Sequence, residues 1–92
     1  MNYLLDLGFN NETINKILEI NGDTISLSFE CNEENITNII NYLKKIGIKN
    51  IDQILIYEVD FFLNNFEEVK RKINNYEIID NINEDYAYVE NL

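Results

Sequence analysis

The side chains best suited to chemistry lie near the end of the chain, where carboxylates are interleaved with tyrosines. Residues 73–92 carry five acids and no base. Such a surface attracts basic protein surfaces, and tyrosines provide large contact areas in protein interfaces. The alternative is a solvated surface that only aids solubility. We predict a partner-binding site of seven residues, which are Glu77, Asp80, Glu84, Asp85, Tyr86, Tyr88 and Glu90.

Groups for catalysis are scarce. The chain has no histidine, so the commonest general base and metal ligand are missing. It also lacks a glycine-rich phosphate loop and a Gly-x-Ser-x-Gly nucleophile turn. Cys31, the single cysteine, has no histidine to activate it, and we expect it to be a buried or half-buried apolar residue. The sequence therefore predicts that the protein is not an enzyme and has no catalytic or cofactor-binding residues.

The remaining carboxylates and the bases have structural explanations. The pairs Glu33-Glu34 and Glu67-Glu68 fall in the first turns of predicted helices, where the helix dipole favours anions. The triplet Asn81-x-Asn83-x-Asp85 is like the start of a calcium loop, but Tyr86 replaces the turn glycine. We therefore predict no metal site. The bases of residues 44–72 sit where helix C-termini favour cations, and they are Lys44, Lys45, Lys49, Lys70, Arg71 and Lys72.

Length and composition indicate one soluble domain. The chain has 92 residues and a net charge of −10, which repels nucleic acid and anionic membranes at long range. No apolar run approaches the roughly 20 residues that span a bilayer, and a single cysteine forms no internal disulfide. Dispersed asparagine and isoleucine indicate a genome of low GC content. We expect a location in the cytoplasm of a low-GC bacterium or of a phage-infected host.

Three helices have clear start and stop signals. The strongest covers about Glu33 to Ile46, with Asn32 as its N-cap, a buried isoleucine and leucine stripe, and Gly47 at its end. A second covers about 12–20, and a third covers about 65–74 with Asn65 as its cap. A short leading helix ends at Gly8. We expect the aromatic residues of 57–62 to lie in the core.

Two segments favour either helix or strand. Residues 24–30 alternate between polar and apolar side chains, and residues 53–59 are rich in β-formers. The last segment, 76–92, fits either a helix or a hairpin that turns at Asp80-Asn81. The favoured fold is all-α, a short stack of helical repeats, and the alternative is an α+β domain with strands near 24–30 and 53–59.

An internal repeat favours the helical fold. The segments 3–9 and 42–48 are similar, and Ile-x-x-Ile-Leu follows each of them, at 14–18 and at 51–55. The period is about 35–40 residues, which is typical of stacked helical repeats. We divide the chain into repeat-like units at about 3–41 and 42–75, followed by the acidic C-terminal segment 76–92.

Segments 42–48, 51–56 and 60–69 together resemble a repeat of the mitochondrial transcription termination factor family. The resemblance lies in the spacing of leucine, glycine and apolar residues. It implies repeats of two helices and a short third, stacked into a curved solenoid. It also implies nucleic-acid binding through basic residues on the concave face, although the charge of this chain does not supply an evident basic face.

Two functions of different classes follow from these observations. The first is a non-catalytic acidic protein that occupies the basic site of a nucleic-acid-handling protein, as a nucleic-acid mimic of the anti-CRISPR or anti-restriction type. The second is a nucleic-acid-binding regulator like the termination factors, which requires the six bases of residues 44–72 to converge on one face. Homo-oligomerisation stays open, because a short repeat stack has apolar ends that pairing would cover.

Overall fold

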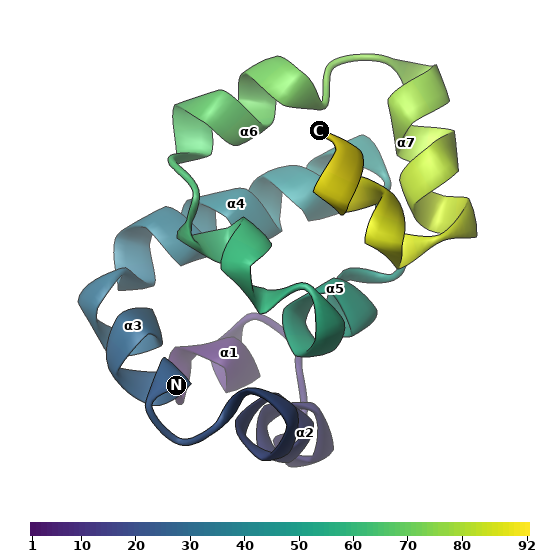
Figure 1. The fold of residues 1–92 in the computed structure, drawn as a ribbon. Helices are drawn as coiled ribbons and strands as arrows, with labels where there is room; N and C mark the ends of the chain where they lie inside the picture. The colour runs from purple at the N-terminus through teal and green to yellow at the C-terminus, as the bar shows by residue number, and fades with distance from the viewer.

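The chain folds into helices without any strand, as the computed structural model of residues 1–92 shows (Figure 1). The all-α prediction is therefore confirmed, and the α+β alternative is wrong. The α-helices are α1 (Tyr3–Asp6), α2 (Asn11–Asn21), α3 (Ile25–Cys31), α4 (Glu33–Ile46), α5 (Ile51–Tyr57), α6 (Phe66–Lys72) and α7 (Tyr76–Glu84). Two 3₁₀ helices complete the fold, η1 (Val59–Leu63) and η2 (Tyr86–Asn91).

Helix α4 is the longest element, and the sequence explains most of it. Its apolar stripe is fully buried, and it consists of Ile36, Ile39, Ile40 and Leu43. Gly47 ends the helix in the left-handed conformation with φ of 94°, which costs glycine little. At the other end Asn32 occupies the predicted N-cap position, but it makes no capping hydrogen bond. The Asn32 side chain does not cap α4 but donates to the carbonyl oxygen of Ser28 at 2.7 Å.

Packing between helices explains why the segments with an ambiguous sequence are helical. Helix α5 packs along α2 and buries Ile51, Ile54 and Leu55, whose spacing suits one helical face. In α3 the polar–apolar alternation gives no buried face, since Phe29 is fully buried while Leu27 is 67 % exposed. The hairpin at 80–81 is also wrong, because both residues lie inside α7.

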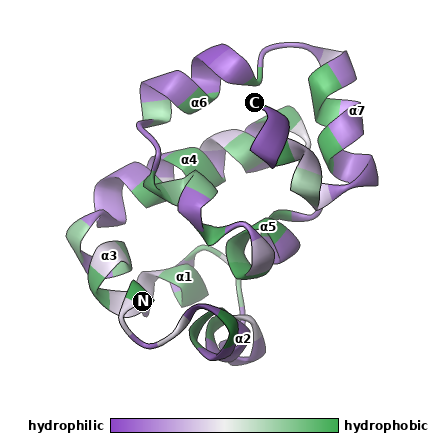
Figure 2. Cartoon of the chain, viewed as in Figure 1, coloured by the Kyte–Doolittle hydropathy of each residue, from purple (hydrophilic) through white to green (hydrophobic).

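The core runs through the middle of the molecule along α4 (Figures 1 and 2). Helix α6 packs on α4, η1 packs on both α4 and α5, and η2 packs on α5 and α7. The order α-helix, α-helix, 3₁₀ helix occurs twice, at 33–63 and 66–91. The boundary predicted between the repeat-like units at about 3–41 and 42–75 falls inside α4, whereas the observed groups of helices meet at 63–66. No helix is both long and apolar enough to cross a membrane.

Asparagine side chains tie these segments together through backbone groups. The Asn35 amide donates to the carbonyl oxygen of Asn64 at 2.7 Å, and its oxygen accepts from the N–H of Phe66 at 3.0 Å. Asn50 donates to the carbonyl oxygen of Ile82 at 2.8 Å. These contacts fix the link before α6 and the end of α7, so the C-terminal third of the chain is held against α4 and α5.

Candidate protein-binding surface

The first half of the predicted site lies on α7. Glu77, Asp80 and Glu84 are all exposed, and their spacing places them on one face of the helix. The opposite face contains Ile82, which is fully buried. Asn75 caps the helix by accepting from the N–H of Ile78 at 3.0 Å. Helix α7 therefore presents three carboxylates to solvent on one face.

The second half lies on η2, where two of the predicted residues also have structural roles. The Asp85 carboxylate caps η2 by accepting from the N–H of Ala87 at 3.0 Å. Tyr86 is half-buried, and its ring lies 5.4 Å from that of Tyr57 at 30°. Tyr88 is half-buried against the core, whereas Glu90 is exposed. The tyrosines thus offer only part of their surface to a partner.

The predicted site missed two carboxylates that lie beside η2. Glu58 and Asp60, at the start of η1, line a cavity of about 380 Å³ together with Glu90. Phe61 and Val89 form the apolar part of its wall. The net charge of residues 44–72 is close to zero, because the bases of this segment offset its acids. The sum over the segment therefore gave no sign of these two carboxylates. The signal that could have found them is the pair of acids that flanks Val59.

The pKa of Glu58 reflects the negative charges that surround it. Burial raises the pKa of the Glu58 carboxyl, and the charge of Glu90 together with a hydrogen bond to it raises that pKa further. The charges of Asp85 and Asp60 act in the same direction. We call these four residues, Glu58, Asp60, Asp85 and Glu90, the acidic cluster. It brings segments from two parts of the chain together into one region of negative potential.

No base neutralises the acidic cluster. The ion pairs of the structure join Glu30 to the N-terminal amine, Glu12 to Lys16, and Glu68 to Arg71. Lys72 lines a cavity of about 200 Å³ together with Glu90, but it makes no ion pair within 4.0 Å. The cluster is therefore free to pair with cations of another molecule.

The six bases of residues 44–72 do not gather in one cavity. Lys44 and Lys49 line one cavity, Lys45 lines a second, and Lys72 lines a third. The Lys70 ammonium lies over the Phe66 ring, 5.3 Å from its centroid. The remaining base, Arg71, pairs with Glu68.

Two predictions about single residues are wrong. Cys31 is exposed at the end of α3, because the helix turns this position away from the face that buries Phe29. Tyr57 is 49 % exposed, whereas Phe61 and Phe62 are buried as expected. Tyr57 thereby adds a solvent-accessible aromatic ring next to the acidic cluster, beside Glu58 in sequence. No three side chains of the types His, Cys, Asp and Glu are arranged to hold a metal ion.

Comparison with known proteins gives no relative. No family model matches the chain, and neither a curated protein nor a solved structure matches it.

Proposed function

We propose that this protein is a non-catalytic acidic binder that occupies a basic site on a partner protein. The single observation that carries the proposal is the acidic cluster, whose four carboxylates lie close together without a base to neutralise them. The four carboxylates repel one another in the free protein, and cationic side chains of a partner would reduce that repulsion on binding. Helix α7 adds three exposed acids, and it is followed directly by Asp85, which belongs to the acidic cluster.

The partner class in this proposal is a nucleic-acid-handling protein. Carboxylates at intervals along helices stand in for phosphates, so the basic groove of a nuclease or a similar protein is a complementary surface. The protein would then act as an inhibitor of the anti-CRISPR or anti-restriction type. Its place of action would be the cytoplasm of a low-GC bacterium or of a phage-infected cell.

Charge-neutralising variants test the proposal. The immobilised chain is used to capture proteins from a nuclease-treated lysate at about 0.05 M and about 0.5 M salt, since screening weakens exposed charge pairs. The test variant is E58Q/D60N/E90Q. The matched control is D6N/E19Q/D23N, which removes the same charge from exposed acids outside any ion pair.

The expected result is a protein captured by the wild-type chain and by the control variant but not by the test variant. Capture should weaken at the higher salt, and added duplex DNA should compete with it. A partner that the test variant retains fully, or that DNA fails to displace, would contradict the proposal.

Direct nucleic-acid binding is the second candidate function. It requires the six bases to act together, but four of them are spread over three cavities and the other two are engaged with Glu68 and Phe66. A mobility-shift assay at low salt separates the two functions. A shift of DNA or RNA by the free chain, lost when Lys70 and Lys72 are replaced by glutamine, would favour this candidate.

A further inference from the structure

An apolar cavity lies between the end of α4, the link from α6 to α7 and the first turns of α7 (Figure 1). Its volume is about 350 Å³. Most of its lining is apolar or aromatic, and these residues are Tyr42, Ile46, Ile73, Tyr76 and Ile79. We call this cavity the α7 groove. The proposed function does not use it, because the groove lies at the start of α7 whereas Asp85 follows the end of that helix.

Tyr76 is the most exposed large apolar side chain of the structure, with 83 % of its surface accessible. It begins α7 directly after Asn75, whose side chain caps the helix by accepting from the N–H of Ile78 at 3.0 Å. A tyrosine ring provides a large contact area once it is buried, and that gain is lost while the ring stays in water. The rim of an apolar groove therefore carries an aromatic ring that no other part of this chain covers.

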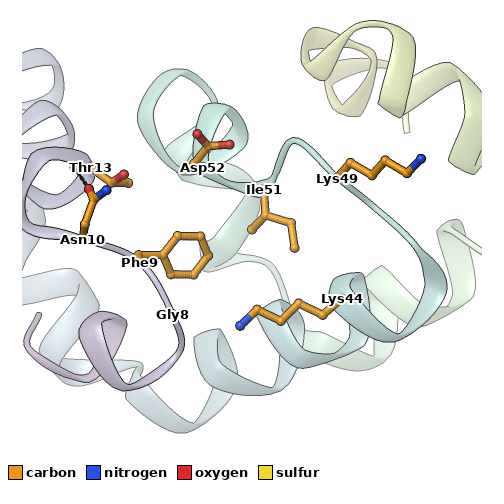
Figure 3. Close-up of a pocket in the computed structure, with 8 residues that line it drawn as sticks. All are labelled: Gly8, Phe9, Asn10, Thr13, Lys44, Lys49, Ile51 and Asp52. Carbon is orange, nitrogen blue, oxygen red and sulfur yellow. Dashed lines mark hydrogen bonds between the residues drawn. The ribbon is translucent and has the colours of Figure 1, made fainter.

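The charges at the α7 groove are complementary but not paired. Lys45 lines the groove from the last turn of α4 and makes no ion pair. Its neighbour Lys44 is engaged elsewhere in the chain, since its ammonium lies 5.5 Å from the centroid of the Phe9 ring (Figure 3). Asp80 is exposed one turn along α7 from Tyr76 and also makes no ion pair. One surface thus carries a free base and a free acid.

A surface with a protruding ring, a hollow, an acid and a base is able to pair with itself. In a dimer with two-fold symmetry the same patch lies on both sides, so every contact occurs twice. Tyr76 of each copy would enter the groove of the other, and Asp80 of each copy would face Lys45 of the other. Cavities of about 150 Å³ already hold a benzene ring, so the groove is large enough for a tyrosine side chain.

We propose that the α7 groove binds a second copy of this chain, with Tyr76 and the pair of Lys45 and Asp80 at the centre of a two-fold dimer. Charge complementarity favours this occupant, because the acid that Lys45 lacks within its own chain is present on the same patch of another copy. The dimer does not depend on the acidic cluster, three members of which line a separate cavity of about 380 Å³.

Sedimentation equilibrium of the full chain at several concentrations tests the dimer. Two copies with a net charge of −10 repel each other at long range. The buffer therefore contains about 0.15 M salt, which screens charges farther apart than about 8 Å. We expect a monomer–dimer equilibrium with a dissociation constant on the order of 100 μM, because a small patch gives a weak interface. A chain that stays monomeric up to about 1 mM would overturn the proposal.

A substitution of the exposed ring locates the interface. Y76S should raise the dissociation constant at least about tenfold, because the symmetric dimer loses two buried aromatic rings at once. The matched control is L27S, which removes the next most exposed large apolar side chain, 67 % accessible and outside the groove. L27S should leave the dissociation constant unchanged. A dimer that Y76S leaves intact would overturn the proposal.

Charge reversal tests the ion pair. K45E and D80K should each weaken the dimer about fivefold, and K45E/D80K should restore it to within about threefold of the wild type, because the reversed pair again attracts. D80K is the sharper of the two variants, since it lowers the net negative charge and general repulsion alone would predict a tighter dimer. The controls are K16E and E19K, which make the same changes of charge on α2.

Circular dichroism confirms that each variant is folded before it is centrifuged. Equal weakening by K45E and K16E, a tighter dimer of D80K, or a double variant as weak as K45E would overturn the proposal, since each result would reflect net charge or another surface. So would a monomeric chain in which Y76S loses the protein that the acidic cluster captures, because the groove would then belong to that partner.

Discussion

Asn35 gives the sharpest test of how the C-terminal third of the chain is held. Its side chain donates a hydrogen bond to the carbonyl oxygen of Asn64 and accepts one from the N–H of Phe66. These two bonds attach the link between η1 and α6 to α4. Replacement by alanine removes both hydrogen bonds and leaves two backbone groups without partners. Each net hydrogen bond contributes about 1 kcal/mol, so the loss is about 2 kcal/mol before the change in helix propensity.

Asn38 is the matched control, because it lies on the same helix, is exposed and makes no side-chain hydrogen bond. Both substitutions gain about 0.5 kcal/mol from the higher helix propensity of alanine. N38A should therefore be slightly more stable than the wild type, and N35A should unfold about 2 kcal/mol more easily than N38A. In thermal unfolding followed by circular dichroism, that difference corresponds to about 10 °C. Equal melting temperatures for the two variants would show that the two hydrogen bonds of Asn35 do not stabilise the fold.

Three further predictions concern Glu58, Gly47 and Cys31. The raised pKa of Glu58 means that its contribution to stability is fully present below pH 4.5 and is lost as pH rises through the folded-state pKa; urea unfolding between pH 4 and 7 should show E58Q losing less stability than the wild type. G47A should destabilise α4 by about 1 kcal/mol, since φ of 94° is strained for alanine even though nothing lies within 4 Å of the added Cβ; a denaturant midpoint equal to that of the wild type would contradict this reasoning. The Cys31 thiol should react with a thiol reagent in the native state as completely as in denaturant, and a thiol that reacts only after unfolding would show that it is buried.

The sequence predicted those helices whose ends are set by local interactions. Helix α6 begins at Phe66 after the cap Asn65, whose side chain accepts from the N–H of Glu67, and its last turn carries three bases. Helix α4 ends at Gly47 for an equally local reason. Caps, dipole partners and a left-handed glycine all act within one or two turns, so they can be recognised without knowledge of the packing.

The short helices α3 and α5 could not be predicted in this way. Helix α5 has seven residues, too few for helix propensity to decide against its β-formers. What decides is its packing against α2 and η2, which buries Ile54 and Leu55 completely. Helix α3 depends similarly on Phe29, which enters the core while Leu27 stays exposed. These choices follow from contacts between segments, which the order of residues does not show.

The candidate site shows the same division between local and tertiary information. Its C-terminal half was predictable because residues 73–92 contain acids without bases. Glu58 and Asp60 joined it only through the packing of η2 on α5 and of η1 beside it. The structural use of Asp85 as a cap and the partial burial of Tyr86 likewise depend on the turn between α7 and η2.

The distribution of charge within residues 44–72 explains why the acidic cluster keeps its charge. Residues 44–72 contain six bases and five acids, so this part is nearly neutral by composition. Lys44 and Lys70 are nevertheless held by aromatic rings and a carbonyl, and of these bases only Arg71 makes an ion pair. Positive charge is thereby kept apart from Glu58 and Asp60, although all of these residues lie within the same third of the sequence. Because these bases make no ion pair with Glu58 or Asp60, the acidic cluster keeps the negative charge that the proposed function requires.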